Sequence, residues 1–120
     1  MDGEIDPAEL DERLGDETDR RIVDIRNPEA FDRGHIPGAE NHPLRSLPDG
    51  VEEVADADHV VTVCPRGKAS VRAAELIGSF EGAADTTVES LAGGLEAWDG
   101  PLDSQQGEEG PADAGSDAPF

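Results

Sequence analysis

Apolar residues occur in short runs whose composition and spacing predict strands. Arg21–Ile25 and His59–Val63 are rich in β-branched residues and are bounded by charged or turn-forming residues, which favours buried strands. Thr86–Val88 is a third candidate strand, and Ala39–His42 is a fourth, shorter one.

Helical periodicity separates these runs. Ala73, Ile77 and Phe80 follow the i, i+4, i+7 spacing of one helix face. Asp6 and Asn27 each precede a proline, a combination typical of a helix start. Helices or helical turns are therefore expected from Asp6 onward, from Asn27 to Phe31, from Val51 to Ala55, from Val71 to Phe80 and from Leu95 to Trp98.

Strands that alternate with helices predict an α/β domain in which a central parallel sheet has helices on both faces. The 120-residue chain is long enough for one such domain, which we assign to residues 1–102. Residues 103–120 are rich in Gly, Pro, Ser and acids, a composition typical of a disordered tail. Because such sheets bind ligands beyond the carboxyl ends of their strands, the residues that follow the strands are the first candidates for a site.

The chain carries 29 Asp and Glu against nine Lys and Arg, for a net charge of −20. The tail holds five of these acids and no base, so the predicted domain is itself strongly acidic. This charge argues against nucleic acid as a partner, because basic patches bind phosphate backbones. The acidity and the single lysine favour adaptation to a high-salt cytoplasm, which screens self-repulsion; an ordinary acidic protein is the alternative.

The cysteine content and the N-terminal residues bear on location. One cysteine rules out an internal disulfide framework and fits a reducing compartment. Residues 1–6 have neither the basic region nor the apolar stretch of a signal peptide. No apolar run approaches the ~20 residues of a membrane span. We therefore expect a cytoplasmic protein with no membrane partner.

The single cysteine, Cys64, lies where a predicted strand meets a predicted helix. It directly follows His59–Val63 and precedes Val71–Phe80. Pro65 favours an extended backbone at the cysteine, and Gly67 permits the positive φ of a tight turn. The thiol should therefore face the first amides of the helix, which have no intrahelical acceptors and attract anions.

This loop composition favours a reactive thiolate. An unperturbed cysteine has a pKa of about 8.5, and helix N-termini or nearby cations lower it to roughly 3.5–7.5. Arg66 and Lys68, the only lysine, supply such cations. The alternative is that Cys64 is a small buried packing residue, but packing alone requires neither Gly67 nor two adjacent cations.

Three segments, in order, resemble the signatures of rhodanese-like domains. Asp24-Ile25-Arg26, Phe31 and Gly34-His35-Ile36-Pro37-Gly38-Ala39-Glu40-Asn41 resemble the N-terminal signature. Cys64–Ser70 resembles the active-site loop, and Gly93–Trp98 resembles the C-terminal signature. The resemblance extends from Ile5 to Leu102 and leaves out the tail.

The resemblance implies a sulfurtransferase that requires no metal or organic cofactor. The Cys64 thiolate would attack the sulfane sulfur of a small anionic donor such as thiosulfate, and a thiol or a partner protein would then accept the outer sulfur of the persulfide. Arg66 and Lys68 would either orient the donor or only lower the thiol pKa and offset the acidic surface. The substrate-binding residues implied are Pro65, Arg66, Gly67, Lys68, Ala69 and Ser70.

Other residues of the three segments are interpreted as structural. Asp24 and Arg26 are predicted to form a pair that braces the Cys64 loop. His35 is assigned to a structural loop, since a thiolate of low pKa needs no base, and Trp98 is assigned to packing. The three histidines and one cysteine lack the spacing of metal ligands.

Three other functions remain as alternatives. Cysteine phosphatases and arsenate reductases of similar fold need Cys-x5-Arg, whereas the sixth residue after Cys64 is Ser70. A persulfide carrier that delivers sulfur to a biosynthetic partner would use the same cysteine. A non-catalytic regulatory module is the third alternative, although such modules commonly lack the cysteine.

The charge predicts how stability responds to salt. We expect the melting temperature to rise with KCl concentration, because at ~1 M salt the Debye length is about 3 Å and the repulsion among surface carboxylates is screened. Thermal unfolding followed by circular dichroism across a KCl series checks this. A melting temperature that does not rise would contradict adaptation to high salt.

Overall fold

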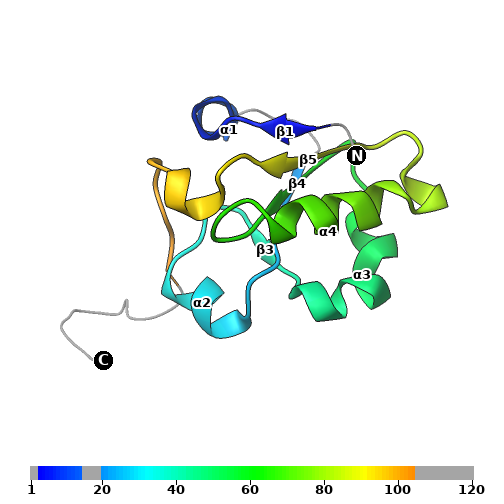
Figure 1. Cartoon of the computed structure of the whole chain (residues 1–120), viewed down its shortest axis with the longest axis horizontal. Helices are drawn as coiled ribbons and strands as arrows, with labels where there is room; N and C mark the ends of the chain where they lie inside the picture. The colour runs from blue at the N-terminus through cyan, green and yellow to red at the C-terminus, as the bar shows by residue number, and fades with distance from the viewer. Residues whose placement is uncertain (1–2, 15–19, 105–120) are drawn as a thin grey trace.

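The computed structural model describes residues 3–14 and 20–104, which form an α/β domain with a five-stranded parallel sheet of order β1-β5-β4-β2-β3 (Figure 1). The strands are β1 (Glu4–Ile5), β2 (Arg20–Asp24), β3 (Glu40–Asn41), β4 (His59–Val63) and β5 (Thr87–Leu91). The α-helices are α1 (Pro7–Arg13), α2 (Pro28–Arg33), α3 (Leu47–Val54) and α4 (Ala69–Gly78), and the 3-10 helices are η1 (Leu44–Ser46), η2 (Glu81–Ala83) and η3 (Gly94–Ala97). The predicted fold class is confirmed.

Two helices begin as their capping residues predict. The Asp6 carboxylate accepts a hydrogen bond from the Ala8 amide at 3.0 Å, and the Asn27 side chain accepts one from the Ala30 amide at 2.9 Å. Each cap satisfies one of the amides that a helix start leaves without an acceptor. The prolines that follow the caps cost nothing here, because the first helical position donates no intrahelical hydrogen bond.

The sheet separates two apolar cores. Alternate residues of β2 and β4 point to opposite faces, so Val23 and Val60 join one core while Ile22 and Val61 join the other. α3 and α4 cover the first face, where they lie side by side (Figure 1). Leu10 of α1, with Leu95 and Trp98 of the η3 region, covers the second. The strand β4 lies in the middle of the sheet and is buried on both faces, which fixes the position of the residue that follows it.

Some boundaries differ from those expected. α4 begins at Ala69 rather than Val71 and ends at Gly78. α3 begins at Leu47, four residues before the expected turn, because Pro48 suits the first turn and Leu47 is fully buried against the first core. β5 extends to Leu91, and the short edge strand β1, which the pattern does not predict, pairs with it.

The first two residues of the predicted tail contact the domain. Asp103 and His35 form an antiparallel bridge with backbone hydrogen bonds of 2.8 and 2.7 Å, and the Ser104 hydroxyl donates to the Asp32 carbonyl. Residues 105–120, the rest of the predicted tail, lie outside the described residues. Within residues 3–14 and 20–104, no helix has the length and apolar character needed to cross a membrane.

Candidate active site

Cys64 follows the central strand β4, at the carboxyl edge of the sheet. Its side chain is 2 % exposed and belongs to the core on the α3 and α4 face. Residues 65–68 connect it to the first turn of α4. The thiol therefore lies between the end of a buried strand and the start of a helix, as the sequence predicts.

Backbone and side-chain groups converge on the sulfur. The Gly67 amide donates to Cys64 Sγ at 3.1 Å, and the Ser70 amide donates at 3.3 Å. Sγ also lies 3.3 Å from Ser70 Oγ, which in turn lies 2.7 Å from Ser90 Oγ. The thiol donates to Ser70 Oγ, and the hydroxyl can donate to the sulfur once the proton is lost. These groups can hold a negative charge on the sulfur.

The pKa of the Cys64 thiol lies below its ordinary value. Burial raises the pKa, because it disfavours the charged thiolate. The hydrogen bonds to the sulfur outweigh burial, and they come from the Ser70 hydroxyl and from the backbone amides of Ser70, Arg66 and Gly67. Arg66 therefore lowers the thiol pKa through its backbone amide, whereas sequence reasoning considered the charge of its side chain.

The loop side chains divide into exposed and buried ones. Arg66 and Lys68 are exposed, as is Pro65, while Gly67 is buried and Ala69 is half-buried. Arg66 Nε lies 3.5 Å from the Glu96 carboxylate, and both side chains are exposed, so water weakens this pair. Lys68 forms no ion pair within residues 3–14 and 20–104. No described hydrogen bond joins either cationic side chain to the sulfur.

The segment that includes η3 supports the Cys64 loop from the other side. The Leu95 amide donates to the Cys64 carbonyl at 2.9 Å, and the Glu96 amide donates to the Pro65 carbonyl at 3.0 Å. Gly94 has φ +64°, and a Cβ there would overlap the Cys64 carbonyl oxygen and lie 2.5 Å from the Gly67 nitrogen. The close backbone contact therefore requires glycine. Sequence reasoning treated Gly94 only as part of a signature; consecutive glycines were the available signal.

Asp24 and Arg26 form the predicted pair. Asp24 is fully buried, and its carboxylate accepts from Arg26 Nε at 2.9 Å and from Arg26 Nη2 at 2.7 Å. Arg26 Nη2 also donates to the Gly34 carbonyl at 2.6 Å. The described hydrogen bonds of the pair therefore brace the loop that begins at Gly34 rather than the Cys64 loop. The nearest link to the cysteine is through the backbone, where the Ile25 amide donates to the Val63 carbonyl at 3.0 Å.

His35 and Trp98 have the structural positions that were predicted. The His35 ring is buried, stacks on Phe31 with centroids 3.9 Å apart, and hydrogen-bonds the Phe31 carbonyl through Nδ1 at 2.8 Å. Trp98 is buried in the second core, and its indole nitrogen donates to the Pro101 carbonyl at 3.0 Å. Among the described residues, no group of three or more His, Cys, Asp and Glu is arranged to hold a metal ion.

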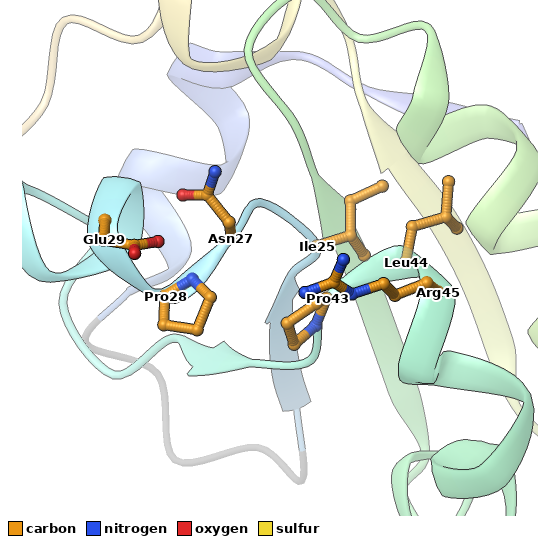
Figure 2. Close-up of a pocket in the computed structure, with 7 residues that line it drawn as sticks. All are labelled: Ile25, Asn27, Pro28, Glu29, Pro43, Leu44 and Arg45. Carbon is orange, nitrogen blue, oxygen red and sulfur yellow. The ribbon is translucent and has the colours of Figure 1, made fainter.

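A cavity of about 650 Å³ lies at the same edge of the sheet (Figure 2). Its lining includes Ile25, directly after β2, and Leu44 and Arg45 of η1. Leu44 packs against the core that contains both Ile25 and Cys64. Sequence reasoning did not identify this cavity, because Leu44 and Arg45 lie between the predicted strand Ala39–His42 and the predicted helical turn Val51–Ala55 and belong to neither.

The family model described as Rhodanese-like domain matches residues 6–100. The chain belongs to the rhodanese-like domain family. The match includes all three segments on which the resemblance was based, so that interpretation is confirmed at the level of the family.

Similar rhodanese-like proteins agree with this assignment. A protein of Stutzerimonas stutzeri named thiosulfate sulfurtransferase GlpE is 41 % identical over 78 residues, which cover 64 % of this chain and 68 % of that protein. A Pseudomonas aeruginosa protein of the same name is 38 % identical over 95 residues, covering 77 % and 83 %. The solution structure of the rhodanese-like domain of the Anabaena protein Alr3790 has a TM-score of 0.74 at 28 % identity, covering 97 % of this chain and 89 % of that one.

The contact between Gly94 and the Cys64 loop predicts the effect of adding one methyl group. Gly94→Ala should lower the free energy of unfolding by about 1–3 kcal/mol more than Gly38→Ala does, because both glycines have positive φ but only Gly94 faces backbone atoms. Chemical denaturation at constant KCl measures both values. If Gly94→Ala and Gly38→Ala lower the free energy of unfolding equally, the backbone contact at Gly94 adds no cost beyond that of the positive φ.

The Ser70 hydroxyl predicts a pH effect. Ser70→Ala removes a hydrogen bond that lowers the thiol pKa, so the midpoint of the pH profile for Cys64 alkylation should move to higher pH. At any pH below that midpoint, the variant should therefore react more slowly than the wild type. Iodoacetamide alkylation followed by mass spectrometry gives the profile.

The matched control is Ser79→Ala, which removes an exposed hydroxyl near the other end of α4. Its alkylation midpoint should equal that of the wild type. A Ser70→Ala profile that coincides with both would contradict a role of the hydroxyl in stabilising the thiolate. Thermal unfolding of each variant shows whether the loss of the Ser90 contact has affected the fold.

Proposed function

We propose that this rhodanese-like protein is a sulfurtransferase that carries a sulfane sulfur as a persulfide on Cys64. The observation that carries the proposal is the set of donors around Sγ at the end of the central strand: the Gly67 and Ser70 amides and the Ser70 hydroxyl. The name shared by the GlpE relatives, thiosulfate sulfurtransferase, supports the same reaction.

In the first half-reaction, the Cys64 thiolate attacks the terminal sulfur of thiosulfate. The new bond joins Sγ to that sulfur, the sulfur–sulfur bond of thiosulfate breaks, and sulfite leaves with the electron pair. The lowered thiol pKa supplies the thiolate, and no general base is needed. The negative charge of the resulting persulfide lies on its outer sulfur, and the loop amides that surround Sγ are the donors proposed to stabilise it.

In the second half-reaction, a nucleophilic acceptor takes the outer sulfur and Cys64 returns as the thiolate. Cys64 is 2 % exposed, so donor and acceptor must approach its sulfur from the solvent side of the loop. Arg66 and Lys68 are exposed residues of that loop and can attract anionic donors against the net charge of −20. The residues proposed to bind substrate are those of the loop from Pro65 to Ser70.

The proposal predicts a specific gain in mass. After incubation with thiosulfate in KCl, the wild-type protein should gain one sulfur atom, about 32 Da, and Cys64→Ser should gain none. Intact-mass spectrometry before and after reduction by dithiothreitol checks this, because reduction should remove the added mass. Because Cys64 is the only cysteine, the Cys64→Ser variant has no thiol, and any mass that it gains cannot be a cysteine persulfide.

Turnover then distinguishes an enzyme from a carrier. Many turnovers with thiosulfate and a small acceptor would assign an enzyme. Ready loading without turnover would assign a persulfide carrier that depends on a partner protein. The absence of any added sulfur, with thiosulfate or with another sulfane donor, would overturn the proposal in favour of a binding module.

A further inference from the structure

The cavity beside Cys64 has a position suited to a molecule that reacts at the loop. The Leu44 amide donates to the Ile25 carbonyl at 3.1 Å, and the Ile25 amide donates to the Val63 carbonyl at 3.0 Å. These hydrogen bonds place the cavity-lining segments next to the residue that precedes Cys64. Ile25, which lines the cavity, also belongs to the same apolar core as Cys64, so one wall of the cavity packs in the core that contains the cysteine.

The lining of the cavity combines apolar surface with two opposite charges. Pro28 and Pro43 lie between Glu29 and Arg45 in Figure 2, and the guanidinium of Arg45 extends over Pro43. Glu29 and Arg45 are exposed, and neither forms an ion pair in the described part of the chain. Both charges are therefore available to a ligand.

Other cavities of the domain have a different character. One contains Glu52, Glu53 and Asp56, and its cation, Arg21, is held by the Glu40 carboxylate at 2.7 Å. A second is lined by three aspartates and no cation: Asp6, Asp11 and Asp99. The cavity beside Cys64 thus differs from these two, because it presents an unpaired cation together with an unpaired carboxylate near a reactive sulfur.

We propose that this cavity binds the sulfur acceptor, and that the acceptor is a small peptide-like thiol with a free ammonium group and a free carboxylate. Arg45 would receive the carboxylate and Glu29 the ammonium group, while the prolines and Ile25 contact the backbone of the ligand between them. A purely anionic thiol would face the Glu29 carboxylate, and a neutral one would gain from neither charge. A volume of about 650 Å³ accommodates a ligand of tripeptide size.

The transfer that this acceptor completes is a simple displacement, and it rests on the proposed function. The acceptor thiolate attacks the outer sulfur of the Cys64 persulfide. A bond forms between the acceptor sulfur and the outer sulfur, and the bond from the outer sulfur to Sγ breaks. Its electron pair returns to Sγ, which is again a thiolate held by the loop amides, and the outer sulfur leaves on the acceptor.

The test uses four forms of one peptide, Gly-Cys-Gly: with both ends free, N-acetylated, C-amidated, and blocked at both ends. The protein is loaded with sulfur from inorganic polysulfide, and the second-order rate constant for loss of the persulfide is measured by intact mass. The KCl concentration is the lowest that keeps the domain folded, because salt screens exposed charges. Comparing each variant with the wild type for the same peptide cancels the intrinsic reactivity of its thiol.

Two variants should separate the two ends of the peptide. Arg45→Gln should lower the rate constant about two- to fivefold for the peptides with a free carboxylate and leave the C-amidated forms unchanged. Glu29→Gln should lower it by a similar factor for the peptides with a free ammonium group and leave the N-acetylated forms unchanged. The control variants Arg33→Gln and Glu12→Gln remove the same charges away from the cavity and should change none of the four rates.

The outcomes distinguish the two proposals. Failure of Cys64 to take up sulfur from polysulfide or thiosulfate would overturn the sulfurtransferase and, with it, the acceptor site. If Cys64 loads normally but neither Arg45→Gln nor Glu29→Gln distinguishes the rate constants of the four peptides, the acceptor site alone is overturned. A uniform loss of rate for all four would identify a structural effect of the substitution, which also contradicts the proposal.

Discussion

The hydrogen bonds between the Cys64 sulfur and the start of α4 are the interaction on which both the local fold and the chemistry depend. α4 has no side-chain cap, because Lys68 occupies the capping position and makes no capping hydrogen bond. The sulfur accepts from the Ser70 amide in the first turn instead, and it also accepts from the Gly67 amide in the loop. A helix that needs acceptors at its start and a thiolate that needs donors thus satisfy each other. The helix consequently starts two residues earlier than its apolar periodicity predicts.

The loop keeps this geometry because elements far apart in the sequence hold it. The buried strand β4 fixes Cys64 on one side, and the backbone of Gly94 and Leu95 lies against the Cys64 carbonyl on the other. Functional groups held by packed strands and by backbone hydrogen bonds keep a more constant geometry than groups on a free loop. The Asp24–Arg26 pair lies further from the cysteine, and it holds the loop that begins at Gly34. The Asn41 side chain fixes the end of β2 by donating to the Asp24 and Arg26 carbonyls.

The features predictable from sequence are those encoded locally. The caps at Asp6 and Asn27, the strand before Cys64 and the tight turn at Gly67 each depend on a few neighbouring residues, and each is present. The features that were missed depend on contacts across the chain. Gly94 packs against a loop that lies 30 residues earlier, and Arg45 borders a cavity with Glu29 only because β2 and β3 pair. The hydrogen bond from Arg26 to the Gly34 carbonyl was not predictable for the same reason: the position of that carbonyl is a property of the tertiary structure.

The distribution of charge connects the acidity of the chain with its chemistry. Five of the nine cations form ion pairs or hydrogen bonds with other side chains of the domain: Arg13, Arg20, Arg21, Arg26 and Arg66. Arg45 and Lys68, which border the cavity and the loop, form no ion pair within residues 3–14 and 20–104. An anion that approaches a chain of net charge −20 is repelled at long range, but this repulsion vanishes beyond the Debye length of about 3 Å at ~1 M salt. Contacts with Lys68 and Arg45 act over about one Debye length, so salt screens them less than it screens the repulsion from more distant carboxylates. Concentrated salt therefore removes the barrier to an anionic substrate more completely than it removes the attraction at the site.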